Sequence, residues 1–166
     1  MLLRPLLAGV AMLSGAAPAG PGSYVIRPAA EFRAANSGFW VPDAAIVAAA
    51  KAALLAYLHT PHRPREAAGE AAWSESRRPE IMARIDDYAL QFMGVGRGRR
   101  NHADSFRRSP RRAVLINGVC RGALRELAGN LETQLVAVLD GGSCFFRAVY
   151  DPRSRRIVAF DVNGAG

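Results

Sequence analysis

The carboxyl-terminal stretch 134–164 constrains the fold most, because strand pattern and turn chemistry agree there over a long run. It reads QLVAVLDGGSCFFRAVYDPRSRRIVAFDVNG. Period-two alternation groups three apolar side chains on one face of each of two strands: Phe146, Ala148 and Tyr150, then Val158, Phe160 and Val162. The Asp, Pro and Ser of the intervening segment 151–155 favour a chain reversal. The sequence therefore predicts a β-hairpin.

A second glycine-rich turn precedes this hairpin. Asp140-Gly141-Gly142 supplies residues that adopt positive φ without steric cost. The pattern fits either another reversal or a glycine bulge, and both interpretations stay open.

A long helix is predicted from Pro42-Asp43 to about His59. Proline suits the first helical turn, and an aspartate there favours the positive end of the helix dipole. Apolar residues recur at spacings of three and four and form one stripe: Val47, Ala50, Leu54, and Tyr57 or Leu58. Such a stripe can cover one face of a sheet.

Two more strands are predicted upstream of the hairpin. In 85–95, alternation places Tyr88, Leu90 and Phe92 on one face and Gln91, Met93 and Val95 on the other. The segment 113–119, AVLINGV, again has strand character. Between the helix and these strands, 66–76 fits a short helix or a mobile loop. The segment 121–130 fits one or two helical turns that Gly129-Asn130 would end.

The first residues have the pattern of a secretory signal peptide. Arg4 precedes an apolar run over about 6–13, and Ala17-Pro18-Ala19 matches a cleavage site. The alternative is a buried amino-terminal helix. The apolar run is shorter than the roughly 20 residues of a membrane span, and no later run reaches that length. We therefore predict a signal peptide at 1–19, a loosely held arm at 20–39, and a single domain at 40–166.

Cys120 and Cys144 are the only cysteines. An even number of cysteines in an exported chain favours a disulfide, which would stabilise the fold by about 3 kcal/mol. Two buried free thiols are the alternative. The C-x-x-C spacing of thioredoxin-like redox sites is absent.

The formal net charge of +8 arises from 22 basic and 14 acidic residues. Seven arginines concentrate in the segment 97–112, which holds a single acidic residue: Arg97, Arg99, Arg100, Arg107, Arg108, Arg111 and Arg112. Arginine binds phosphate or sulfate through two parallel hydrogen bonds, and Phe106 adds a stacking surface. The segment is a candidate anion site, and a merely solvated charged loop is the alternative. The partners that this charge predicts are an anionic envelope polymer, a lipid surface or an acidic protein.

No residue pattern indicates a cofactor, a metal or a catalytic group. Gly94, Gly96 and Gly98 lack the G-x-G-x-x-G spacing of nucleotide sites. His59 and His62 flank a proline at a helix end, and no cysteine or acidic cluster completes a ligand set with them or with His102. Ser143 lacks the G-x-S-x-G context of a nucleophile.

The order of one long helix, the strands QFMGV and AVLINGV, and a terminal hairpin with DGG, F-x3-YD and VNG resembles small exported bacterial proteins of uncharacterised role. Its layout is also similar to cystatin-like and NTF2-like folds, in which an antiparallel sheet wraps a helix. Cystatins carry a Q-x-V-x-G inhibitory loop, and the segment 91–95, QFMGV, departs from it at the third and fifth positions. The resemblance therefore implies a fold and does not imply protease inhibition.

Together these patterns predict an α+β fold in which one long amino-terminal amphipathic helix packs on a four- or five-stranded antiparallel sheet. The function that they favour is that of an exported, non-catalytic protein that binds a ligand through the open face of the sheet or the arginine-rich segment. The alternative is a small enzyme of cystatin-like or NTF2-like fold, with Tyr88, Gln91 or Asp161 lining a pocket inside the curved sheet.

Overall fold

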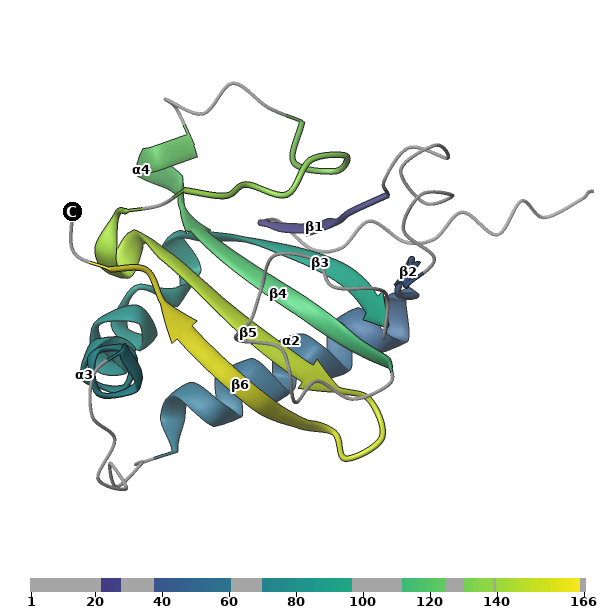
Figure 1. Ribbon diagram of the computed structural model, residues 1–166, viewed down its shortest axis with the longest axis horizontal. Helices are drawn as coiled ribbons and strands as arrows, with labels where there is room; N and C mark the ends of the chain where they lie inside the picture. The colour runs from purple at the N-terminus through teal and green to yellow at the C-terminus, as the bar shows by residue number, and fades with distance from the viewer. Residues whose placement is uncertain are drawn as a thin grey trace, which may run out of the picture.

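A computed structural model describes residues 22–27, 38–60, 70–96, 112–124, 130–138 and 140–164. Its centre is a mixed, six-stranded sheet (Figure 1). The strands are β1 (Ser23–Val25), β2 (Phe39–Trp40), β3 (Tyr88–Gly96), β4 (Arg112–Cys120), β5 (Phe145–Asp151) and β6 (Arg156–Val162). The order is β1-β3-β4-β5-β6, and β2 also pairs with β3.

The prediction of an entirely antiparallel sheet with a leading helix is wrong in two respects. Neighbours from β3 to β6 run antiparallel, but β1 runs parallel to β3. Two short strands also precede the first helix among the described residues. The segment 22–27 therefore belongs to the sheet instead of a loose arm, and Ile26 buries its side chain beside Met93. Strands of three and two residues carry too little periodic pattern to be recognised in sequence.

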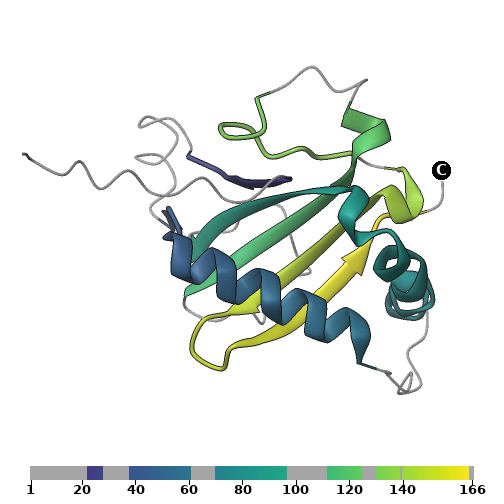
Figure 2. The same cartoon turned by 180° about the vertical axis from the view of Figure 1, so that it is seen from behind.

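Helix α2 (Ala44–His59) confirms the predicted long helix. Asp43 caps its amino end, and the carboxylate accepts a hydrogen bond of 2.8 Å from the backbone N–H of Ile46. The helix lies across one face of the sheet, as the view from behind shows (Figure 2). The residues that it buries there form the expected stripe: Val47, Ala50, Leu54 and Leu58.

Helix α3 (Glu70–Ala83) settles the choice left open for 66–76 in favour of a helix within its described part. It continues through Pro79, which is exposed. The buried Arg78 of this helix donates hydrogen bonds to the carbonyl oxygens of Tyr57 and Thr60 and pairs with Glu75. These carbonyls lie at the carboxyl end of α2, so a cation there satisfies acceptors that the helix leaves free.

The predicted β5–β6 hairpin is present, with one change. The Asp151 carboxylate accepts bonds from the Arg153 N–H and the Ser154 hydroxyl, and these bonds shape the turn. A register shift lies where Val149 and Tyr150 meet β6. Val158 is the extra residue of this bulge and is 49% exposed, so its predicted inward position is wrong.

Two apolar clusters lie on opposite faces of the sheet. The larger cluster includes the α2 stripe and the predicted inward residues of β3 and β5: Tyr88, Leu90, Phe92, Phe146, Ala148 and Tyr150. The smaller cluster contains Met93, Leu115 and Val149, with Val95 packed against it. The predicted assignment of β3 residues to two faces is therefore confirmed.

The predicted disulfide between Cys120 and Cys144 is present, with an S–S distance of 2.06 Å. Cys120 ends β4 and Cys144 ends a 3-10 turn, Gly142–Cys144. Gly141 and Gly142 have φ of 132° and 55°, so the glycine pair forms a turn. The bond joins this turn to the helix-covered side of the sheet.

The remaining short elements agree with the sequence only in part, because the strand predicted at 85–95 begins at Tyr88. Helix α4 (Arg121–Leu124) is one turn in the segment where one or two were predicted. A 3-10 turn, Ile85–Asp87, occupies the first residues of the segment predicted as a strand at 85–95.

Candidate functional site

The arginine-rich segment connects the ends of β3 and β4. Gly96 and Arg112 are the last register partners of this antiparallel pair, and the connection between them, 97–111, is termed the hairpin tip. Six of the candidate anion-binding arginines lie outside the described residues: Arg97, Arg99, Arg100, Arg107, Arg108 and Arg111. Arg112 is described and marks where the segment rejoins the sheet.

Arg112 stacks on an aromatic ring at this end of the sheet. Its guanidinium carbon lies 4.0 Å from the centroid of the Trp40 ring, and the residue is exposed. The indole N–H of Trp40 donates a 3.3 Å hydrogen bond to the carbonyl of Val95. Gly94 makes room for the indole, because a Cβ at that position would lie 2.4 Å from the indole carbon Cδ2 of Trp40. The tryptophan is thus fixed on β3, and the guanidinium lies over its ring.

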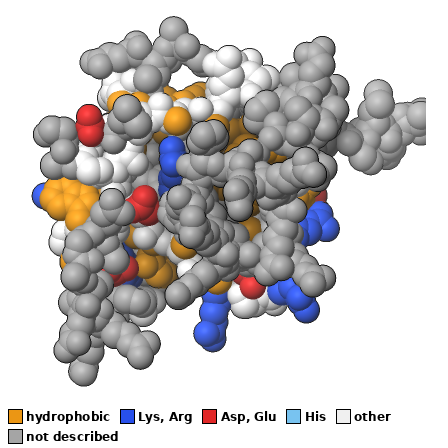
Figure 3. Space-filling view, viewed as in Figure 1, with side chains coloured by type: hydrophobic (Ala, Val, Ile, Leu, Met, Phe, Trp, Pro, Cys, Tyr) orange, Lys and Arg blue, Asp and Glu red, His pale blue; other side chains and the backbone are white. Residues whose placement is uncertain are grey.

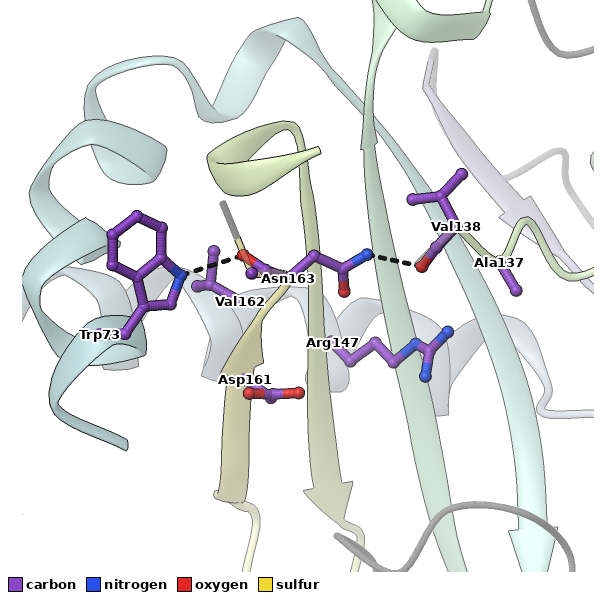
Figure 4. A pocket seen from close by; sticks show the side chains of 8 residues that line it. Trp73, Ala137, Val138, Arg147, Asp161, Val162 and Asn163 are labelled. Carbon is purple, nitrogen blue, oxygen red and sulfur yellow. Dashed lines mark hydrogen bonds between the residues drawn. The ribbon is translucent and has the colours of Figure 1, made fainter. Parts of the chain in front are cut away.

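A cleft of about 510 Å³ lies at the end of the sheet away from Gly96 and Arg112, on the face away from α2 (Figure 4). Strands β5 and β6, helix α3 and the segment 137–138 supply its walls. The lining residues are Trp73, Ala137, Val138, Arg147, Asp161, Val162, Asn163 and Gly164. Its volume falls in the range typical of small-molecule sites, about 300 to 1,000 Å³.

Two hydrogen bonds fix the walls of this cleft. The Trp73 indole N–H donates to the carbonyl of Asn163 at 3.0 Å, and the Asn163 amide donates to the carbonyl of Val138 at 2.8 Å. Arg77 lies over the Trp73 ring at 4.1 Å from its centroid. The tryptophan therefore joins α3 to the end of β6, and Asn163 joins β6 to the segment that precedes the glycine turn.

A buried amide pair holds a further part of this face. The side chain of Gln91 donates to the carbonyls of Leu131 and Gln134 and accepts from the Val136 N–H, at 2.8 to 2.9 Å. Asn117 donates to the Gln91 side-chain oxygen at 2.9 Å and to the carbonyl of Val136. Both side chains are buried. These bonds hold the irregular segment 130–138 against this face of the sheet. On the other face, hydrophobic packing holds α2 against the sheet.

Of the residues predicted to line a pocket, only Asp161 does so. Gln91 is buried in the amide network, and Tyr88 lies on the helix-covered face. The Tyr88 hydroxyl donates to the carbonyl of Ser143, and burial raises the pKa of Tyr88 to about 12. Neither residue is placed to act in the cleft, and the alternative function as an enzyme stays a prediction.

Ser143 is hydrogen-bonded to a carboxylate, and the described residues form no metal site. Ser143 donates to the Glu80 carboxylate, but Glu80 also lies near Arg77 and Arg84, which offset its negative charge. Within the described ranges no group of three potential ligands could hold a metal ion. His59 is at the exposed end of α2, and His62 and His102 lie outside the described residues.

The face of the sheet that carries the cleft is turned toward the viewer in Figure 3, where Lys and Arg side chains project from the right-hand and lower edges of the molecule.

The helices of the described ranges are too short or too polar to cross a membrane.

Comparison of the chain with family models, with curated proteins and with solved structures gave no match. The resemblance to cystatin-like and NTF2-like folds therefore stays a prediction. What the chain does must be argued from its own residues.

Proposed function

We propose that this is an exported, non-catalytic protein that binds an anionic polymer or surface of the cell envelope through the arginine-rich tip of its β3–β4 hairpin. The observation that carries the proposal is the position of Arg112. Its guanidinium lies over the Trp40 ring where the arginine-rich segment joins the sheet, and no acidic partner is found for it among the described residues.

A stacked guanidinium suits anion binding for two reasons. Stacking on the indole restrains the side chain, so less conformational entropy is lost when a ligand binds. The edge of the guanidinium stays available, and it can donate two parallel hydrogen bonds to a phosphate, sulfate or carboxylate. The six other arginines of the segment lie close to Arg112 in sequence and supply further positive charge.

Export is supported by the signal-peptide pattern of the first residues together with the disulfide. Cys120 and Cys144 form a bond of the kind that persists in oxidising compartments. A basic protein in the cell envelope meets anionic polymers and lipid headgroups, and its attraction to them weakens as salt rises.

The experiment compares two triple variants of the mature protein that remove equal charge. The test variant is Arg107→Gln, Arg108→Gln and Arg111→Gln, in the arginine-rich segment. The control is Arg153→Gln, Arg155→Gln and Arg156→Gln, at the exposed β5–β6 turn. Retention on heparin and binding to vesicles with and without anionic lipid are measured as salt is raised, and circular dichroism checks the fold of each variant.

We expect the test variant to elute at lower salt than both the control and the wild type. On double-stranded DNA, used as a polyanion of known charge density, the slope of log affinity against log salt should fall by up to about 3. Equal loss in the two variants would mean that net charge alone causes binding, and it would overturn the assignment to the hairpin tip. Unchanged retention in both would overturn anion binding itself.

A further inference from the structure

The cleft on the face away from α2 contains two opposite charges that do not pair with each other. Arg147 of β5 and Asp161 of β6 are direct register partners. Opposite charges at such positions ordinarily attract and close on each other. Here no ion pair joins them, although both side chains are half-buried and belong to the same cleft.

Each of the two side chains is directed away from the other. The Asp161 carboxylate accepts a 3.2 Å hydrogen bond from the Ser74 hydroxyl of α3. That hydroxyl accepts in turn from the Val162 N–H at 2.9 Å, so its proton is available for the carboxylate. Arg147 extends in the other direction, toward β4 (Figure 4). Its guanidinium has no hydrogen bond or ion pair with any described residue.

A third polar group points into the space between them. Because the Asn163 amide nitrogen donates to the carbonyl of Val138, its oxygen is the atom that faces Arg147 and Asp161 in Figure 4. The cleft therefore offers five guanidinium donors at one end, and a carboxylate with an amide acceptor toward the other. Trp73 closes the side next to α3.

We infer that this cleft binds a small zwitterion, namely a short peptide or amino acid with a free carboxylate and a free ammonium group. The ligand carboxylate pairs with Arg147, and its ammonium group is held by Asp161 and the Asn163 oxygen. A ligand with both charges satisfies both walls at once, whereas a simple anion would place negative charge near Asp161. The site is separate from the arginine-rich segment, so the inference goes beyond the function proposed above.

The register bulge is what places these two charges together. Continuing the pairing of Asp151 with Arg156 without a shift would set Arg147 opposite Phe160. The extra residue Val158 moves Asp161 into that position. β-Bulges often occur next to functional sites, where they redirect side chains.

The first test uses the unmodified protein and a ligand series, so it does not depend on any variant folding. Isothermal titration calorimetry is carried out with Ala-Ala-Ala, with its N-acetylated form, with its carboxyl-terminal amide, and with alanine. We expect the tripeptide to bind and each cap to weaken binding by about 10- to 100-fold, because each cap removes one charge-assisted contact. Binding of alanine as tight as that of the tripeptide would identify a free amino acid as the ligand.

The second test assigns each charge to its residue. Arg147→Gln should weaken binding of the tripeptide and of its N-acetylated form, while Asp161→Asn should weaken only ligands with a free ammonium group. The amide oxygen introduced by Asp161→Asn can still accept a hydrogen bond from the Ser74 hydroxyl, so this variant should fold. The matched controls are Arg153→Gln and Asp86→Asn, which remove one exposed charge of each sign outside the cleft.

Three outcomes would overturn the inference. The first is that no ligand in the series binds, and the second is that capped and free peptides bind equally well. The third is that the control variants lose as much affinity as the cleft variants. The arginine-segment variant should keep full peptide affinity. Loss of heparin retention with peptide binding intact, or the reverse, therefore separates failure of this inference from failure of the proposed function.

Discussion

The two faces of the sheet are closed by different forces. On the helix-covered face, α2 packs apolar side chains against Phe92, Phe146 and their neighbours, and the larger cluster forms. On the opposite face, two buried amides hold the irregular segment 130–138 in place, and the smaller cluster contains fewer of the described residues. Part of that second face stays open as the cleft.

This difference indicates a division of roles. Burial of apolar area is non-directional and supplies most of the stability. Hydrogen bonds to an irregular segment contribute less net free energy but fix its position closely. We therefore assign stability mainly to the helix-covered face and binding to the opposite face and the β3–β4 hairpin tip.

The largest expected effect is on the helix-covered face. Phe146 is fully buried, and its ring contacts the rings of Tyr88 and Phe160. Phe146→Ala should lower the free energy of unfolding by about 3 to 5 kcal/mol. Urea unfolding measures the change, with the exposed Val158→Ala as control at about 0.5 kcal/mol or less. A loss below about 1 kcal/mol would remove the distinction between the faces.

Opening the disulfide should have the next largest effect. Replacing Cys120 and Cys144 by serine releases a crosslink with a sequence separation of 24, which contributes about 3 kcal/mol. The bond lies at the helix-covered side, so affinity for zwitterionic peptides should persist wherever the variant is still folded. Thermal unfolding and calorimetry together check this, and lost affinity in a folded variant would show that the two faces are coupled.

Gln91→Leu should cost less stability but change the second face more. It leaves the carbonyls of Leu131 and Gln134 and the N–H of Val136 without their side-chain partner. We expect a loss of about 2 kcal/mol. Hydrogen exchange should rise first in 130–138, whereas Phe146→Ala should raise it across the whole sheet. A uniform rise in both variants would argue against separate roles for the amide pair and the core.

The smallest effect concerns alkaline pH. Burial raises the pKa of Tyr88 to about 12, and burial also raises the pKa of Tyr57. Because these hydroxyls stay neutral in the folded protein while the unfolded chain ionises them near pH 10, stability is fully present below about pH 10 and is lost as pH rises toward 12. Tyr88→Phe should make this decline shallower in urea unfolding. An unchanged decline would place the responsible group elsewhere.

The sequence predicted the parts of the fold that have a long periodic pattern. The stripe of α2, the alternation in β3 and the β5–β6 turn each repeat over enough residues to be recognised. Strands β1 and β2 do not, since their positions depend on partners in β3. The charge cluster of the candidate anion site was visible in sequence, but the stacking of Arg112 on Trp40 joins residues far apart in the chain.

The cleft was predicted only through Asp161. Its partner Arg147 was hidden because the simple register of the hairpin sets that residue opposite Phe160, and a bulge is seldom visible in a sequence. The apolar pattern did contain one signal. Four residues, 152–155, separate the two strands, and a regular register across them would not keep both inward rows on one face.

The most direct test of the assignment of anion binding to the β3–β4 hairpin is an amide chemical-shift titration of residues 20–166 with a short heparin oligosaccharide at low salt. We predict that shifts concentrate at the hairpin tip and its bases, Gly96 and Arg112, and that the carboxyl-terminal half of α2 is unaffected. Shifts that are strongest along Ala44–His59, or spread evenly over the surface, would contradict the account.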